Sequence, residues 1–114
     1  MAYKVQQGDI VWISLDPQSG HEQKGRRPAL VVSNNTFNSF TRSFAMLCPI
    51  TNTNRNSPLH VRLDSRTVTS GVIMCDQSNI LDIDIRNAEF IEKAPADIIA
   101  EAVDIVIGFI SIED

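Results

Sequence analysis

Basic side chains gather in two short stretches of this 114-residue chain. The first stretch holds His21, Lys24, Arg26 and Arg27, with Glu22 as its only acid. The second stretch holds Arg55, His60, Arg62 and Arg66. Arginine stays charged and histidine titrates near neutrality, so side chains of these types could bind phosphate and move protons.

The overall charge limits what these cations can do. The formal net charge is −4, and acids dominate from residue 76 onward. Affinity for nucleic acid of any sequence comes mainly from Lys and Arg that neutralise phosphates, so any nucleic-acid binding here must be local. The segregation fits a basic face opposite an acidic face, although a mixed, solvated surface explains the charges equally well.

The first basic stretch lies in a long polar loop between two predicted strands. Residues 10–15 are a β-branched and aromatic run, and residues 29–33 are a second apolar run after Pro28. The connection over residues 18–27 is long for a hairpin. Loops of this length in small domains often carry function, and an ordinary flexible connection is the alternative.

Further strands follow from apolar runs and from alternation. Residues 43–50 and 71–75 predict buried strands, and residues 80–91 predict one or two shorter ones. Residues 34–40 predict a turn with one helical turn, and the polar segment 51–58 predicts an exposed loop. Residues 59–63 alternate strictly, which predicts Leu59, Val61 and Leu63 inward and His60 and Arg62 outward on one face.

Apolar residues recur at helical spacing after Pro95, and they are Ile98, Ile99, Ala102, Val103, Val106, Phe109 and Ile110. This predicts an amphipathic helix that packs on the core or on another subunit. We therefore expect a mainly β (α+β) fold, a small SH3-like antiparallel barrel with a C-terminal helix on its flank. With 43% hydrophobic residues, the chain should form one domain over residues 1–114. Trp12 is predicted to lie in the core, with stacking on a nucleobase as the alternative.

Several classes of protein are disfavoured. Cys48 and Cys75 lie in separate apolar runs, which predicts buried free thiols, and the scattered Cys and His residues show no zinc spacing. We expect no metal and no cofactor. No apolar stretch reaches the length of a membrane span, and residues 1–7 lack the apolar block of a secretion signal, so we expect a cytoplasmic protein.

Taken together, these segments resemble the MazF/PemK toxin family, closer to its MazF branch. The matching residues are Gly8-Asp9-Ile10-Val11-Trp12, Asp16-Pro17, the stretch from Gly20 to Ser33, Cys48-Pro49-Ile50-Thr51 and Gly71-Val72-Ile73-Met74-Cys75-Asp76-Gln77. Their order and spacing hold from Gly8 to the final helix. The resemblance implies a CcdB/MazF/PemK-like barrel and a homodimeric, sequence-specific endoribonuclease from a toxin–antitoxin pair that causes growth arrest.

The resemblance also implies catalytic residues. Arg27 matches the family's catalytic arginine, and Thr51 matches the threonine that holds the scissile phosphate. Metal-free RNA cleavage needs a base for the 2′-hydroxyl, support for the phosphorane oxygens and an acid for the 5′-oxygen. Because arginine is always charged, Arg27 suits phosphate binding better than proton abstraction. The base stays open between His21, which coincides with a histidine implicated in the PemK branch, and Glu22, which could instead orient Arg27.

One position departs from the family. PemK-type members carry an arginine just before Cys-Asp-Gln, whereas this chain has Met74. Asp76 and Gln77 are therefore expected to bind an RNA base or to hold loops, while Arg27 and Thr51 carry catalysis. Without the family, each of these residues has an ordinary explanation as a surface charge, a turn residue or a strand end.

Loops should read the splayed bases of single-stranded RNA. The candidates for RNA contact are Ser19, Gly20, Gln23, Lys24, Arg26, Asn52, Thr53, Asn54, Arg55, Asp76, Gln77 and Ser78.

The expected partners are single-stranded RNA and a MazE-like antitoxin whose acidic, extended segment crosses the basic groove, with no membrane. Two other hypotheses remain. A non-catalytic toxin of the gyrase-poisoning kind would act through the C-terminal helix and dimer face and would need neither Arg27 nor Thr51. The second of these hypotheses is an RNA-binding module or degenerate family member that has lost its catalytic activity. Met74 is the only residue that points to it.

Overall fold

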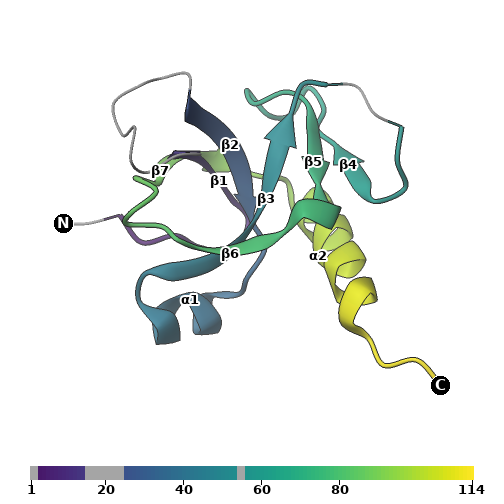
Figure 1. The fold of residues 1–114 in the computed structure, drawn as a ribbon. Helices are drawn as coiled ribbons and strands as arrows, with labels where there is room; N and C mark the ends of the chain where they lie inside the picture. Colours follow the sequence, from purple (N-terminus) through teal and green to yellow (C-terminus); the bar gives the residue numbers. More distant parts are fainter. Residues whose placement is uncertain (1–2, 15–24, 54–55) are drawn as a thin grey trace.

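The computed structural model describes residues 3–14, 25–53 and 56–114 and consists of a strongly curved antiparallel sheet with one long helix on its flank (Figure 1). In chain order the elements are β1 (Asp9–Ser14), β2 (Arg26–Val31), α1 (Asn35–Thr41), β3 (Phe44–Thr51), β4 (His60–Arg62), β5 (Val72–Met74), a 3-10 turn (Cys75–Gln77), β6 (Asn79–Asp82), β7 (Glu89–Lys93) and α2 (Ala96–Ile110).

The strands follow the order β4-β5-β3-β2-β1-β7, and β6 pairs with β3 as well. Strand β3 pairs with two strands in succession: its first half pairs with β6 and its end pairs with β5. The sheet therefore curls into the ring visible in Figure 1. The predicted mainly β class with a C-terminal helix is confirmed. The ring of paired strands is not closed, since β6 and β7 do not pair within the described residues.

A tight turn connects β6 to β7 at the open seam. The chain between β6 and β7 folds back on itself, with the Ala88 amide donating to the Ile83 carbonyl (3.0 Å). The neighbouring Arg86 carbonyl accepts from the Ser14 amide at the end of β1 (2.8 Å). These bonds hold the turn against the end of β1.

The two faces of the sheet bury two separate cores. The helix-side core joins Ile10 and Leu30 of the sheet to α2, while the inner core fills the curl with residues such as Val11 and Val31. The helix residues in the first core are Ile98, Ala102 and Val106. Successive residues at the centre of β1 and at the end of β2 alternate between the cores, which explains the consecutive apolar residues there.

A charged cluster ties the first strand to the last. The Asp9 carboxylate is buried and accepts from the Tyr3 hydroxyl, from the Gln6 amide (2.9 Å) and from Lys93 Nζ (2.7 Å). Burial and the bond to Asp9 raise the pKa of the Tyr3 hydroxyl. Asp9 and Lys93 are also opposite each other in the β1–β7 pairing. A buried carboxylate needs such partners, so the cluster fixes this end of the sheet.

Most predicted elements agree with the structure, and two details differ. The predicted turn at 34–40 is a full helix, α1, capped by the Asn34 side chain, which accepts from the Phe37 amide (2.9 Å). Trp12 was predicted in the core but is 38% exposed. It shares a face of β1 with Ile10 but lies two residues further along, where the Arg26 guanidinium covers it at 5.1 Å from the ring centre. Both cysteines are buried free thiols, as predicted.

The helix-side core predicts which helix residues matter for stability. Ile98 is 3% exposed and belongs to that core, so Ile98→Ala should lower the free energy of unfolding by about 2–5 kcal/mol in chemical denaturation. Ile85→Ala is the matched control, because Ile85 is 58% exposed and its truncation should change stability by less than about 1 kcal/mol. Equal effects of the two substitutions would contradict the assigned core.

Candidate active site

Arg27 and Thr51 lie on the same face of the sheet, where β2 begins and β3 ends. Strands β2 and β3 pair with Ala29 opposite Pro49, and the same register, continued by two residues along each strand, places Arg27 level with Thr51. Opposite residues of antiparallel strands point to the same side of the sheet. On β1, Arg27 is opposite Ile13 of the inner core, so both side chains stand at the rim of the curl. Figure 1 shows where β2 begins and β3 ends.

The Thr51 hydroxyl is held in a defined orientation. Its oxygen accepts a hydrogen bond from the Thr53 amide at 3.2 Å. With this lone pair occupied, the hydroxyl proton is free to be donated to a ligand oxygen. The group is therefore suited to hold a phosphate.

Gly71 fixes the backbone beneath Thr51. Its φ is +118°, and a Cβ atom there would lie 2.3 Å from the Thr51 carbonyl oxygen. The same junction is joined by Ser70, whose hydroxyl donates to the Asn52 side-chain oxygen (2.9 Å). Only glycine fits this close approach of β5 to the end of β3.

Arg27 forms no salt bridge with any residue in the described ranges. It is half-buried, and its guanidinium carries five donors. Such a cation, level with a hydroxyl donor, can bind the non-bridging oxygens of a phosphodiester and stabilise added negative charge during attack.

Arg26 points the other way. It contacts the Trp12 ring and lies 3.5 Å from a Glu89 carboxylate oxygen. Because adjacent residues of a strand face opposite sides, Arg26 does not join Arg27 and Thr51. Of the two neighbouring arginines, the structure brings only Arg27 to the site face.

A second pair lies on the site face, two residues away. His60 of β4 is opposite Met74 of β5, and its Nε2 lies 3.2 Å from Asp76 Oδ1. The predicted alternation is confirmed at Val61 and Leu63, which are buried, and the register places His60 and Arg62 on one face. The predicted burial of Leu59 and exposure of His60 are wrong. Leu59 is 37% exposed, whereas the His60 side chain is only 7% exposed because Asp76, in the 3-10 turn, folds against it.

The Cys48 thiol beside this pair is chemically quiet. Cys75 directly precedes Asp76, and both cysteines are buried in the helix-side core. The neighbouring Cys75 thiol, together with burial, raises the pKa of Cys48. Cys48 therefore stays protonated and acts as a core side chain rather than as a nucleophile.

The other predicted contact residues divide into two groups. Asn52 and Thr53 are exposed beside Thr51, and Gln77 and Ser78 follow Asp76 at the surface. The remaining candidates lie outside the described residues, and they are Ser19, Gly20, His21, Glu22, Gln23, Lys24, Asn54 and Arg55.

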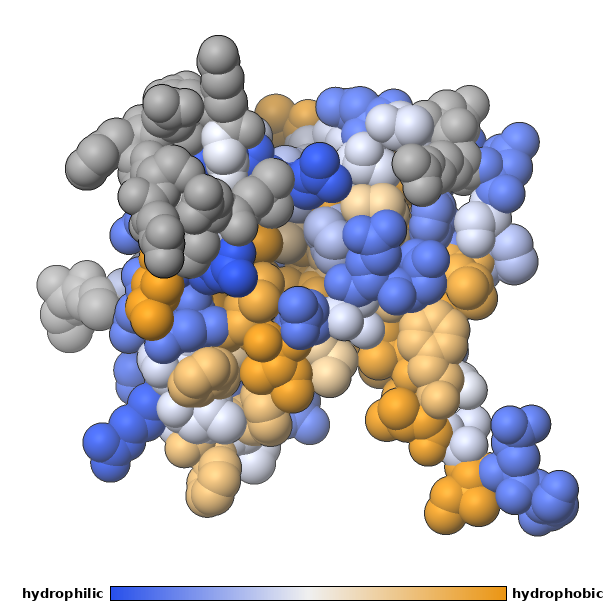
Figure 2. All heavy atoms as spheres, in the orientation of Figure 1, coloured by the Kyte–Doolittle hydropathy of each residue, from blue (hydrophilic) through white to orange (hydrophobic). Residues whose placement is uncertain are grey.

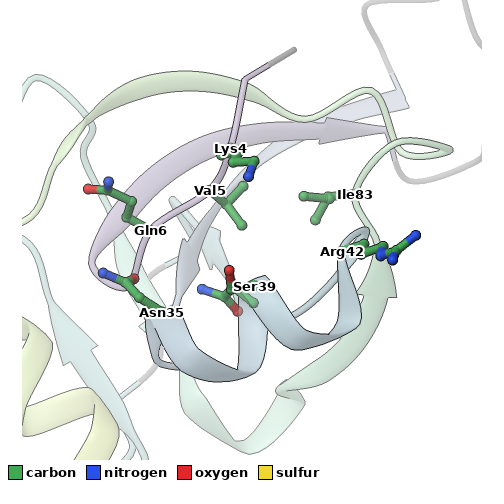
Figure 3. Close-up of a pocket in the computed structure, with 8 residues that line it drawn as sticks. Lys4, Val5, Gln6, Asn35, Ser39, Arg42 and Ile83 are labelled. Atoms are coloured by element: carbon green, nitrogen blue, oxygen red, sulfur yellow. The ribbon is translucent and has the colours of Figure 1, made fainter. Parts of the chain in front are cut away.

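No cluster of metal-ligating side chains competes with this site in the described part of the chain. No three His, Cys, Asp or Glu side chains in these ranges come together as metal ligands. A cavity of about 520 Å³ lies between the N-terminal segment and α1, and no predicted site residue lines it. Figure 3 shows the Arg42 guanidinium pointing away from that cavity. Within these ranges, neither helix has the length and apolar composition needed to cross a bilayer.

Comparison with known proteins decides the family. Residues 6–108 match the model of the PemK-like, MazF-like toxins of type II toxin-antitoxin systems. The chain belongs to this family. It is 38% identical to the endoribonuclease PemK of Escherichia coli over 101 residues, which cover 85% of this chain and 75% of PemK.

Solved structures give the same family. A MazF crystal structure from Deinococcus radiodurans has a TM-score of 0.81 and 38% identity, covering 95% of this chain and 97% of that one. In a MazE–MazF crystal structure from the same organism, the matched chain has a TM-score of 0.82 and 31% identity, covering 98% and 100%. Identity with PemK and with MazF is thus similar, and the comparisons do not separate the two branches.

Sequence reasoning missed the contact between His60 and Asp76 in this toxin. Its presence in a basic stretch was visible, but its contact with Asp76 depends on the β4–β5 register, which brings residues 60 and 74 opposite each other. The intervening segment, residues 63–71, sets that register. The only sequence signal was the alternation of residues 59–63, and it assigned His60 to solvent.

The close approach at Gly71 predicts a sensitive position. Gly71→Ala should destabilise the toxin by about 1–3 kcal/mol and lower any activity that needs Thr51, because the new Cβ pushes on the Thr51 carbonyl. Gly108→Ala is the control, since nothing lies within 4 Å of a Cβ there and helical Ala is favoured over Gly. Thermal unfolding of both variants checks this. A Gly71→Ala variant as stable as Gly108→Ala would show that the junction is not tight.

Proposed function

We propose that this toxin is an endoribonuclease that cleaves single-stranded RNA without a metal ion, and that Arg27 and Thr51 hold the scissile phosphate. The observation that carries the proposal is the β2–β3 register, which places the two residues opposite each other on the same face, at the start of β2 and the end of β3. The PemK relative, and the MazF and ChpB relatives from Escherichia coli, are named endoribonucleases, which supports the same activity here.

The reaction uses the RNA's own 2′-hydroxyl. The 2′-oxygen attacks the adjacent phosphorus while a base takes its proton, and the P–O5′ bond breaks as the 5′-oxygen gains a proton. The products carry a 2′,3′-cyclic phosphate and a 5′-hydroxyl. Arg27 stabilises the charge that grows on the non-bridging oxygens, and the Thr51 hydroxyl donates to one of them. Glu22 and His21 remain our candidates for the base and the acid.

The partners follow from the family. We infer an antitoxin whose acidic segment competes with RNA for Arg27 and its neighbours, because carboxylates and phosphates bind the same guanidinium geometry. The Deinococcus radiodurans MazF relative is seen in complex with MazE. The cytoplasm, where mRNA is translated, is the compartment in which such a toxin would act.

We further propose a homodimer built on α2. Ile107, Phe109 and Ile110 are 52%, 45% and 76% exposed, and Figure 2 shows apolar surface along this helix, in the lower right, beside a hollow. A largely apolar groove of about 310 Å³ runs between α2 and the segment around α1, with Phe37 and Ile80 among its lining residues. Exposed apolar surface of this kind marks an interface.

Removing the guanidinium tests the catalytic proposal. In EDTA, with a long single-stranded RNA, the wild type should give discrete fragments with 5′-hydroxyl and 2′,3′-cyclic phosphate ends. Arg27→Ala and Thr51→Val should each lower kcat by about 10²- to 10³-fold, because each removes one donor to the phosphorane. Arg42→Ala removes the same charge from an exposed position outside the site and should retain the activity.

Two outcomes of that experiment would contradict the proposal. Undiminished cleavage by Arg27→Ala would remove the residue from the mechanism. Cleavage that EDTA abolishes and Mg²⁺ restores would replace the mechanism with a metal-dependent one. A wild-type protein that cuts no RNA yet still arrests growth would favour a non-catalytic toxin.

A charge on α2 tests the dimer. Ile107→Glu and Ile110→Glu should shift the toxin from dimer to monomer in light scattering, because each places a carboxylate in the apolar face. Val68→Glu is the control, since Val68 is 91% exposed on a different segment and should leave the dimer intact. A wild type that is monomeric at all concentrations, or dimers that persist in both α2 variants, would locate the interface elsewhere or exclude it.

A further inference from the structure

His60 and Asp76 lie on the same face as the proposed phosphate site, displaced along the strands. Thr51 is opposite Val72, and Val72 is opposite Arg62, so these residues form one row across the sheet. His60 and Met74 form the next row on that face. Two strand residues span about 7 Å, so the pair sits beside the phosphate site and not on it. An RNA group that reaches it is therefore a group other than the scissile phosphate itself.

The hydrogen bond between the two side chains has a defined direction. The Nε2 atom of His60 lies 3.2 Å from Asp76 Oδ1, while Nδ1 is buried with no partner among the described residues. A proton on Nδ1 would be a buried donor without an acceptor, which is strongly unfavourable. The arrangement therefore places the proton on Nε2, where it is donated to Asp76. Asp76 is then the acceptor of this bond.

This geometry decides what Asp76 can bind. Its side chain is 38% exposed, and its hydrogen bond within the described ranges joins Oδ1 to His60, so the carboxylate keeps accessible surface for a further donor. A carboxylate is an acceptor, so it suits N–H donors and does not suit the acceptor oxygens of phosphate. In single-stranded RNA, such donors lie on the base edges.

The four bases differ in what they offer to a carboxylate. Cytosine, adenine and guanine each carry an exocyclic amino group, and Asp or Glu accepts from such groups. The only N–H on the Watson–Crick edge of uracil lies between two carbonyl oxygens, which a carboxylate repels. We propose that His60 and Asp76 form a subsite that accepts an amino-bearing base and rejects uracil at a nucleotide beside the scissile phosphate, with His60 as the positioning residue. This inference rests on the proposed ribonuclease function.

Cleavage-site mapping on a randomised RNA pool tests the subsite. At one position next to the cut, the wild type should cleave uracil-containing sequences at least about tenfold less than the other three. Asp76→Asn should erase this difference, because an amide can donate to a uracil oxygen as well as accept. Asp84→Asn, which neutralises an exposed acid in the β6–β7 turn, should keep the wild-type preference. If Asp76→Asn leaves the preference unchanged, the subsite is wrong.

Two variants of His60 separate positioning from simple packing. His60→Gln retains a donor for Asp76 and should keep the discrimination against uracil, whereas His60→Leu fills the space without a donor and should lose it. Thermal unfolding confirms that each variant is folded. Equal preferences in both variants would remove His60 from the subsite, even where Asp76→Asn changes the preference.

The same data separate this inference from the function on which it rests. A wild type that cuts no RNA overturns the proposed function. A wild type that cuts, loses cutting at all sequences in Arg27→Ala, and shows no discrimination against uracil beside the cut retains the function and overturns the subsite.

Discussion

The shared pairing of β3 is the constraint on which the site depends. One strand pairs with β2 on one edge and, on the other edge, first with β6 and then with β5. Residues on one face of β3 are thereby placed level with residues from strands on both sides. Because strand geometry is stiff, the side chains of Thr51 and its neighbours are aimed by the sheet, and their exposure at its edge leaves them open to a ligand.

Much of this could be predicted from the residues themselves, because apolar runs and helical spacing are local properties. The runs containing Val11 and Val31 predicted strands, and the spacing from Ile98 to Val106 predicted α2. The resemblance to the family identified Arg27 and Thr51 as partners, and the register supports that placement. The Arg27–Thr51 geometry itself could not be derived from spacing, since it depends on how α1 returns the chain between β2 and β3.

The errors have one physical origin. Alternation along a strand tells which residues share a face, but it does not tell what covers that face. Trp12 shares the face of Ile10 yet lies beyond the helix-side core, and His60 is covered by a turn that follows in sequence sixteen residues later. The side chains of Arg26 and Arg27 point to opposite faces of the sheet because both residues lie in β2. The sequence alone did not show that the strand begins early enough to include both.

The Asp9 cluster has a consequence for how the molecule folds. It joins β1 to β7, between Asp9 and Lys93, which are far apart in the sequence. Forming contacts between residues so distant in sequence requires closing a long loop, which lowers the entropy of the chain before the contacts stabilise the fold. Such contacts therefore form slowly. Assembly of β2, α1 and β3 is local by comparison and can proceed first. The edge that carries Arg27 and Thr51 can therefore take shape before the fold is complete, while joining the first and last strands remains the slow step.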